Sequence, residues 1–347
     1  MPPTPSTRRA AITGIVTTAA GLALFAWLVW RVGPDEIWSG LVQIGWGMVL
    51  LVALGGLRLG ARATAWVLAM EPPHRLRLRD AFNAVVCGDT LGNVITLGPI
   101  VSEAAKLACV RGRVPLGPAL TALAVENVLY TLSVAGMIAA GTVALLYSFH
   151  LPDRLLWVSE ASLGLLIILF AFVAWLLWRR PKVIATVQAH LDIGPLSRSF
   201  APLEKIKRLE HDLYSFAARR RAAVVPIVGA EAAFHALGVL ETHVTLWMIL
   251  GEPPSVLVSF ILEGAVRLIA VVFKVVPFQV GVGEAGAGAL TQVLGMGTAP
   301  GVTLALARKA RMGIWSLVGG ILLVRQGLTT RKVLEEAEMN PAPQPGP

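Results

Sequence analysis

The sequence predicts an all-α polytopic membrane protein, and two observations indicate this fold class. Hydrophobic residues make up 55% of the 347 residues and charged residues only 15%, against about 25% charged in an ordinary soluble domain. A soluble fold would lack the polar residues needed to cover so much apolar surface. Several apolar stretches are also about 20 residues or longer, the length of a helix that crosses the hydrocarbon core. These observations exclude a soluble enzyme, a secreted disulfide scaffold and a disordered hub.

The net charge of +9 would indicate nucleic-acid binding in a soluble protein. In a membrane protein, excess Lys and Arg instead mark cytoplasmic loops and contacts with anionic lipid. We therefore expect membrane lipids, including anionic ones, as partners, and no nucleic acid. Cys87 and Cys109 lie in or beside apolar segments and should be buried. Without a CxxC pair or a Cys/His cluster, the sequence predicts no metal site and no cofactor.

Six apolar stretches are expected to cross the membrane as helices. The first lacks the small-residue cleavage site of a secretory signal and ends in interfacial Trp27, Trp30 and Arg31, so it should be retained. The second is long enough to tilt strongly or to break at Gly55-Gly56. In chain order the stretches are residues 11–30, 41–70, 115–149, 155–178, 222–250 and 302–324.

Two further regions, residues 80–113 and 255–296, are apolar but interrupted by Gly, Pro and charged residues. The first contains GDTLGNVITLGPIVSEAAK and the second contains KVVPFQVGVGEAGAGAL. Gly- and Pro-containing backbone exposed to hydrocarbon would leave polar groups unpaired, and it is tolerated only where protein or a water-filled cavity surrounds it. We expect each region to be a broken helix, or a re-entrant helical hairpin that dips into the membrane and returns.

Three segments are polar. The N-terminus, residues 1–10, should be disordered. Residues 179–221 form a basic cytoplasmic connector, either one or two amphipathic helices on the membrane surface or a solvated linker without lipid contact. The cytoplasmic tail, residues 326–347, has no apolar period and is expected to be a frayed helix that runs into disorder.

A repeat with an offset of 181 residues relates two parts of the chain. TAWVLAMEPP at 64–73 matches TLWMILGEPP at 245–254, and the same offset aligns Glu103 with Glu284. One register held over roughly 60 residues makes chance similarity of apolar sequence a poor explanation. A single transmembrane domain, residues 11–325, then consists of an extra first helix, a first repeat of about 41–178, the connector, and a second repeat of about 222–325.

The distribution of basic residues indicates opposite orientations for the two copies. Arg8 and Arg9 place the N-terminus inside, since Lys and Arg favour the cytoplasmic side. Arg75, Arg77 and Arg79 place the first EPP loop inside as well, whereas the second EPP loop carries no Lys or Arg and falls outside. We predict a bacterial inner-membrane protein with both termini cytoplasmic and an inverted-topology repeat, the arrangement of alternating-access transporters.

Ionisable residues inside apolar segments are costly and usually face a cavity or a partner. Glu103 and Glu284 each follow a Gly-rich turn and open a small-residue helix. Two roles are open to them: helix capping in the first turn, or proton coupling and cation binding near the midplane. Glycines before them would expose backbone N–H groups that bind an anionic headgroup at a helix start. These glycines are Gly92, Gly98, Gly281 and Gly283.

Further polar residues extend this candidate site for substrate binding or proton coupling. Lys106 lies one turn after Glu103, and Glu126-Asn127 occupies the place in one span that Arg308 occupies in its repeat equivalent. Together with Asp89 and Asn93, these side chains are expected to line one polar cavity.

Other charged residues have simpler explanations. Glu263 and Arg267 are spaced to pair along one helix. Arg58 and Arg62 share one helix face, where they contact phosphate or snorkel to the interface, and snorkelling is favoured.

Glu231, His235 and His243 fall roughly on one face of a span, with Glu241 offset. One helix offers too few ligands for a metal, so structural or protonatable histidines explain the pattern better. Neither a Ser-His-Asp arrangement nor a phosphate-binding P-loop is apparent, and we predict neither catalytic residues nor an enzyme.

Two motifs carry a resemblance to a known family. They are GNVITLGPIVSE at 92–103 and PFQVGVGE at 277–284, the second followed by a helix bearing Arg308. From about residue 10 to 325 the chain resembles the lysylphosphatidylglycerol synthase transmembrane-region family, also called flippase-like integral membrane proteins. It departs from the family pattern at Lys106, where Arg is common, and at Phe278-Gln279, where glycines are usual.

The resemblance implies the membrane-translocation half of the family in a stand-alone form, because the sequence holds no segment long enough for the soluble aminoacyl-transferase domain. We therefore expect a lipid flippase or translocase that moves a phosphate-bearing or isoprenoid lipid between leaflets by alternating access. Two alternatives are a secondary transporter of a small anion and a non-catalytic assembly factor of isoprenoid or hopanoid lipid synthesis.

Overall fold

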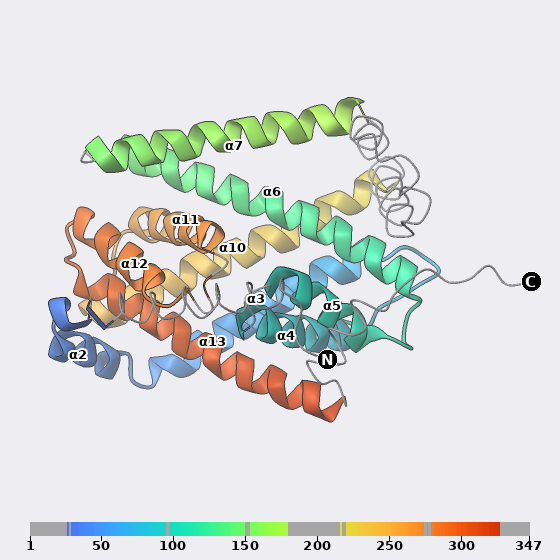
Figure 1. Ribbon diagram of the computed structural model, residues 1–347, viewed down its shortest axis with the longest axis horizontal. Coiled ribbons are helices and arrows are strands. Elements are labelled where there is room, and N and C mark those ends of the chain that lie inside the picture. Colours follow the sequence, from blue (N-terminus) through green and yellow to red (C-terminus); the bar gives the residue numbers. More distant parts are fainter. Residues whose placement is uncertain are drawn as a thin grey trace, which may run out of the picture.

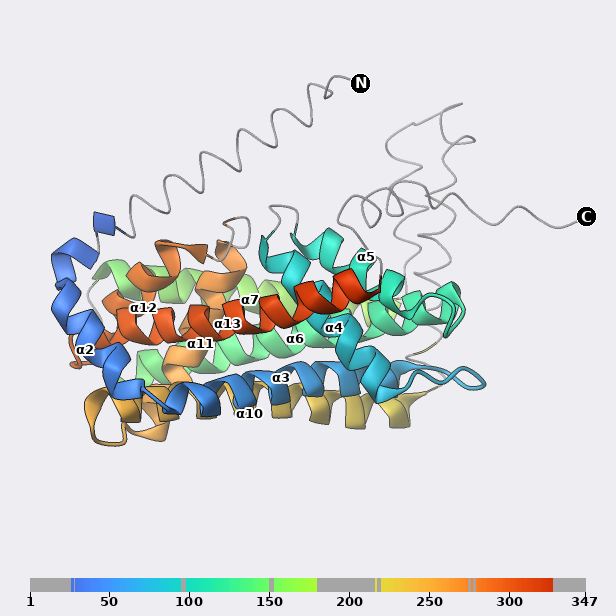
Figure 2. The same cartoon turned by 90° about the horizontal axis from the view of Figure 1, so that it is seen from below.

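The computed structural model describes residues 26–27, 29–94, 98–149, 153–179, 216, 220–273, 276 and 279–326. Within this part of the chain the long regular elements are all α-helices, which confirms the all-α character that the sequence predicts. The long helices lie side by side along one common direction (Figures 1 and 2). Most of the first predicted span, most of the basic connector and nearly all of the tail lie outside the described residues.

The helices fall into two groups on either side of the connector. Before it come α2 (Pro34–Ile44), α3 (Gly47–Ala69), α4 (Leu78–Val94), α5 (Gly98–Val110), α6 (Leu116–Ser148) and α7 (Asp153–Arg179). After it come α10 (Arg221–Leu250), α11 (Val256–Val272), α12 (Val282–Val293) and α13 (Ala299–Arg325).

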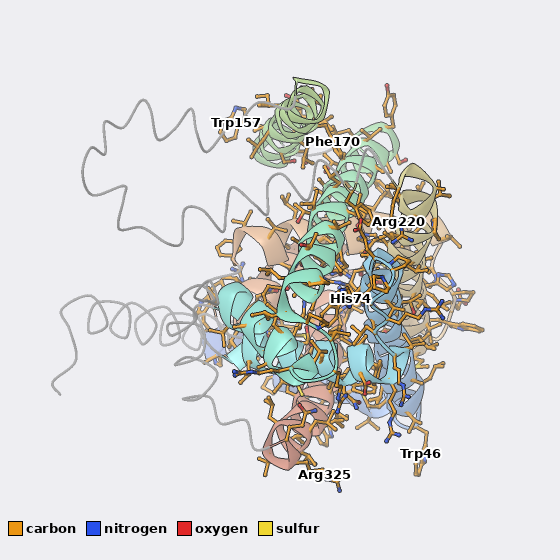
Figure 3. The ribbon with its side chains drawn as sticks, turned by 90° about the vertical axis from the view of Figure 1, so that its right-hand side faces the viewer. Trp46, His74, Trp157, Phe170, Arg220 and Arg325 are labelled. Atoms are coloured by element: carbon orange, nitrogen blue, oxygen red, sulfur yellow. The ribbon has the colours of Figure 1, made fainter. Side chains whose placement is uncertain are left out.

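Among the described residues, three helices are long and apolar enough to cross a membrane. They are Gly47–Ala69, Leu116–Ser148 and Ala222–Leu250, which correspond to α3, α6 and most of α10. The last helix, α13, is 27 residues long but carries Arg308, Lys309 and Arg311 in its central turns. Trp46 and Trp157 project outward from the bundle (Figure 3) and are 91% and 71% exposed, as expected of aromatic side chains near a membrane interface.

The stretch 41–70 is interrupted, but not where the sequence suggested. The interruption between α2 and α3 is at Gly45, whose φ is 40°, whereas the helix continues through Gly55 and Gly56. These two glycines instead let α13 approach closely. A Cβ on Gly55 would lie 2.7 Å from Cδ of Arg311, and one on Gly56 would lie 2.5 Å from the ring of Trp315.

The two interrupted regions are each a pair of short helices. In the first, α4 and α5 have 17 and 13 residues; in the second, α11 and α12 have 17 and 12. At 1.5 Å per residue these arms are about 18–26 Å long, shorter than the roughly 30 Å hydrocarbon core. Figure 2 shows the α4–α5 pair in the half of the bundle where α6 begins, and the α11–α12 pair in the other half.

The offset of 181 relates helix to helix. Ala69 ends α3 and Leu250, 181 residues later, ends α10; in the same way α4, α5 and α6 correspond to α11, α12 and α13. The packing follows this correspondence, because α3 packs against α10, and α4 packs on α13 as α11 packs on α6. In Figure 2, α3 and α10 run in opposite directions, so the two EPP loops lie at opposite ends of the bundle.

Both of the equivalent crossings are made at glycine. Where α6 meets α11, a Cβ on Gly141 would lie 3.1 Å from the Cα of Gly264. Where α4 meets α13, a Cβ on Gly319 would lie 2.8 Å from the carbonyl oxygen of Val86. Small residues at such points let helix backbones approach closely in a membrane.

Candidate functional site

Two groups of ion-paired side chains lie in the interior, beside successive turns of α3. Arg58 belongs to one group and Arg62 to the other. Neither arginine snorkels, so that expectation was wrong: the side chain of Arg58 is only 8% exposed and that of Arg62 only 16%. Both are retained inside because carboxylates from other helices pair with them, and the pattern of one helix could not show this.

We call the first group the arginine cluster. Glu263 of α11 is its centre, since it pairs with Arg58 at 3.4 Å, with Arg267 at 2.9 Å and with Arg308. Glu241 of α10 is the second carboxylate. The cluster joins four helices and consists of Arg58, Glu241, Glu263, Arg267, Arg308 and Arg311.

The arginine cluster carries an excess of positive charge. Its four guanidinium groups pair with two carboxylates, and Asp89 of α4 lies within electrostatic range of Arg311, so positive charge is still in excess. Glu241 is itself shared, at 2.5 Å from Arg58 and 2.8 Å from Arg311. The buried Nε atoms of Arg58 and Arg308 have no hydrogen-bond acceptor among the described residues. These donors and this charge suit an anion better than they suit a closed structural ion pair.

Three positions of α10 shape the arginine cluster. Phe234 offers its ring to two guanidinium groups, those of Arg58 and Arg267, each 4.8 Å from the ring centroid. One turn later, Gly238 leaves room for the ion pair, because a Cβ there would lie 2.5 Å from Oε1 of Glu263. Glu241 follows after a further turn. The i, i+4, i+7 spacing puts all three on one face of α10, a pattern that is already visible in the sequence.

We call the second group the glutamate cluster. Arg62 donates from Nε to Oε1 of Glu126 at 2.7 Å, and Asn127 donates to Oε2 of Glu103 at 2.8 Å. Lys106 pairs with Glu103, also at 2.8 Å. The structure therefore brings together three of the predicted site residues, Glu103, Lys106 and Glu126. The members of the glutamate cluster are Arg62, Glu103, Lys106, Glu126, Asn127 and Glu231.

Glu231 is the member of the glutamate cluster without a hydrogen bond. It is 1% exposed, and neither of its carboxylate oxygens has a hydrogen-bond partner among the described residues. Arg62, Glu126 and Lys106 are the charged groups within electrostatic range. His235, one turn further along α10, shares a hydrogen bond of 3.0 Å with Ser133 of α6. In the described part of the chain, no group of three or more His, Cys, Asp or Glu side chains could hold a metal ion.

Glu284 caps its helix and also forms an ion pair. It is the third residue of α12 and accepts a hydrogen bond of 2.9 Å from the backbone N–H of Gly281, which has φ 83°. Its other oxygen pairs with Lys309 of α13 at 2.5 Å. Lys309 was missed from the sequence, although it directly follows Arg308 in a predicted span.

Glu103 does not cap its helix, contrary to the first-turn position we expected. The α5 helix begins at Gly98, so Glu103 lies in its second turn. Pro99 fits this helix start, since proline is favoured in the first turn of a helix, where it costs no hydrogen bond. Glu103 instead contacts Lys106 and Asn127, as described above.

The remaining predicted residues do not form a single cavity with Glu126. Arg308 belongs to the arginine cluster. Asn93 donates a hydrogen bond of 3.1 Å to Asp89 on α4, and Asp89 lies within electrostatic range of Arg311. The end of α4 therefore adjoins the arginine cluster. Gly98 begins α5, and Gly281 and Gly283 lie at the start of α12, as predicted. Gly92 lies in the last turn of α4, so the prediction that it opens a helix was wrong.

Long apolar helices around a charged interior, in the part of the chain that the structure describes, are typical of an integral membrane protein. Residues 12–319 match the family described as "Lysylphosphatidylglycerol synthase TM region". The match covers most of the 347 residues, so the chain belongs to this family, and the family indicates a membrane-lipid-related function. No curated protein and no solved structure matches the chain.

Proposed function

We propose that the protein is a lipid flippase that moves a phosphate-bearing lipid between the leaflets of the bacterial inner membrane. The observation that carries this proposal is the excess of positive charge in the arginine cluster. Uncompensated charge is costly inside a membrane and marks a substrate pathway. Arginine binds phosphate oxygens through paired N–H donors. A phosphate-bearing headgroup would neutralise the cluster while its acyl or isoprenoid chains remain in lipid.

Alternating access is the mechanism we propose for this transport. It is supported by the opposite directions of α3 and α10 and by the matching of helices at an offset of 181 (Figure 2). Short helix pairs at the two ends of the bundle fit two re-entrant hairpins that approach from opposite sides. In an inverted repeat of this kind, each half opens the central site to one side in turn. Both termini are then cytoplasmic, as the basic residues predict.

The repeat-related carboxylates Glu103 and Glu284 each form an ion pair with a lysine, within α5 in the first case and with α13 in the second. Glu103 pairs with Lys106 at 2.8 Å and Glu284 pairs with Lys309 at 2.5 Å. An arriving phosphate group would compete with each carboxylate for its lysine, so the pairs can open and close with the substrate. Helix starts at Gly98, and at Gly281 and Gly283, would add backbone N–H donors to the headgroup.

Leaflet exchange in reconstituted liposomes tests the proposal. Fluorescent phosphatidylglycerol, which is anionic, and fluorescent phosphatidylcholine, which is zwitterionic, are followed with a membrane-impermeant quencher. We expect exchange of phosphatidylglycerol to exceed that in protein-free liposomes and to fall about tenfold in Arg308→Gln, equivalent to ~1.4 kcal/mol. Arg325→Gln, at the exposed end of the same helix, is the matched control and should leave exchange unchanged.

Three outcomes would count against the proposal. Lipid exchange no faster than in protein-free liposomes would contradict the flippase function and favour the alternative of a non-catalytic assembly factor. Accumulation of inorganic phosphate without lipid exchange would favour the small-anion transporter, because free phosphate offers the same chemistry to the arginine cluster. Exchange that is unchanged in both Glu103→Gln and Glu284→Gln would remove the role given to the two ion pairs.

A further inference from the structure

Glu231 stands apart from the other buried carboxylates of the membrane interior, and its position supports an inference that rests on the proposed function. We propose that Glu231 is the proton-binding group of the transport cycle. It takes up one proton from water on one side of the membrane and releases it to water on the other side as access alternates.

Burial without hydrogen bonds is the first observation. Glu231 is 1% exposed and lacks a partner for either oxygen among the described residues. An ionised carboxylate in such a place is much more costly than a neutral carboxylic acid. Glu103, Glu126, Glu241, Glu263 and Glu284 differ, because each has a cation paired with it.

The charges that face Glu231 give the second observation. Arg62 of α3, Lys106 of α5 and Glu126 of α6 act on it, together with Tyr130 of α6. The two cations are already occupied, since Arg62 holds Glu126 at 2.7 Å and Lys106 holds Glu103 at 2.8 Å. The glutamate cluster thus has three carboxylates for two cations, and one proton makes it neutral.

The surroundings of His235 connect this site to the arginine cluster. His235 lies one turn after Glu231, and Glu263, Arg58 and Arg62 all act on it. Its Nδ1 has no hydrogen-bond partner among the described residues. Phe234, beside it, packs its ring against that of Tyr130 at 5.6 Å between centroids. The proton site and the anion site therefore adjoin along α10.

A displacement of α3 along α10 couples the two sites. If Arg62 leaves Glu126 and approaches Glu231, it stabilises the ionised Glu231 carboxylate. The O–H bond of Glu231 breaks, and the proton passes to Glu126, which has lost its cation, and from Glu126 to water on the open side. The reverse displacement withdraws Arg62, and Glu231 takes a proton from water again. Arg58 is carried by the same helix, so the arginine cluster changes in the same step.

The test uses the full chain in liposomes that contain phosphatidylglycerol, with two independent readouts. The first is leaflet exchange of fluorescent phosphatidylglycerol with and without a transmembrane pH gradient. The second is the infrared carbonyl band of a protonated carboxylic acid, recorded during a pH titration. The variant is Glu231→Gln, which preserves the shape of the neutral acid. Glu160→Gln, on the exposed surface of α7, is the matched control.

We expect the wild-type protein and Glu160→Gln to exchange lipid several-fold faster under a gradient of one sign. Glu231→Gln should exchange lipid at a rate independent of the gradient, and it should lose one carbonyl band. A band that persists in Glu231→Gln, or a gradient response equal to that of the wild type, would overturn the inference and leave the flippase proposal standing. Absence of lipid exchange in every sample, including the wild type, would overturn both.

Discussion

Glu103 and Glu284 lie 181 residues apart, and each reaches from its hairpin to the long helix that follows. Glu103 accepts a hydrogen bond of 2.8 Å from Asn127 of α6, and Glu284 pairs with Lys309 of α13 at 2.5 Å. The offset carries Asn127 to Arg308, the neighbour of Lys309. Equivalent carboxylates thus contact nearly equivalent positions, although the partner chemistry differs. The repeat therefore preserves the position of the contact on the long helix more closely than the charge of the partner side chain.

The two EPP loops provide a direct test of opposite orientation. In a background with Cys87 and Cys109 replaced by Ser, we introduce single cysteines as His74→Cys and Glu252→Cys. A membrane-impermeant maleimide added outside should label position 252 alone, and position 74 should react only after the membrane is permeabilised. Labelling of both positions from the same side would contradict the inverted repeat.

The crossing of α6 and α11 should tolerate little added volume. In Gly141→Val the new Cβ would lie 3.1 Å from the Cα of Gly264, so the helices must separate. Overpacking of this kind costs about 1–3 kcal/mol, and we expect a lower melting temperature in detergent. Gly117→Val on the same helix is the control, because nothing lies within 4 Å of a Cβ at that position. Equal melting temperatures for the two variants would show that the crossing is not close-packed.

The pairing of Arg58 with Glu241 should appear in a double-mutant cycle. Glu241→Gln removes a carboxylate that Arg58 and Arg311 share at 2.5 and 2.8 Å, and it raises the excess positive charge of the arginine cluster. Loss of one partner from a buried pair costs about 3–5 kcal/mol. Adding Arg58→Gln should recover part of that loss, as measured by thermal unfolding.

Asp80→Asn offers a comparison for this cycle. Asp80 pairs with Arg113, whose side chain is 44% exposed, and exposed pairs contribute about 0–1 kcal/mol. A loss in Asp80→Asn as large as that in Glu241→Gln would mean that burial does not set the strength of the Arg58–Glu241 pair.

Gly238 should matter for transport because of the space it leaves. In Gly238→Ala the added Cβ would lie 2.5 Å from Oε1 of Glu263 and 3.3 Å from Cζ of Arg58, which pushes the carboxylate out of the arginine cluster. We expect exchange of anionic lipid to fall about tenfold, equivalent to ~1.4 kcal/mol. Gly229→Ala, on the same helix with nothing within 4 Å, should exchange lipid normally. Equal lipid-exchange rates for Gly238→Ala and Gly229→Ala would show that transport does not depend on the position of the Glu263 carboxylate.

The long helices could be predicted from the sequence because lipid demands uninterrupted apolar runs, and the predicted spans 115–149 and 222–250 agree closely with α6 and α10. Pairs within one helix were also accessible, since Glu263 and Arg267 pair at the spacing expected of neighbouring turns. Arg58 and Glu241 were not, because 183 residues separate them. Only the packing of α3 on α10 brings the two side chains together, and a local sequence pattern cannot predict a contact between residues so far apart in the chain.

The composition of α13 has a consequence for how the chain enters the membrane. Arg308, Lys309 and Arg311 lie within four residues of each other, and each base near the centre of a helix costs about 2.5–3.5 kcal/mol on translocon insertion scales. Their carboxylate partners are, in the same order, Glu263 on α11, Glu284 on α12 and Glu241 on α10. These three helices are synthesised before α13, so their carboxylates are already in the membrane and can pair with the bases of α13 as it inserts. We therefore expect the carboxylates of the proposed transport site to be needed for membrane insertion of α13 as well.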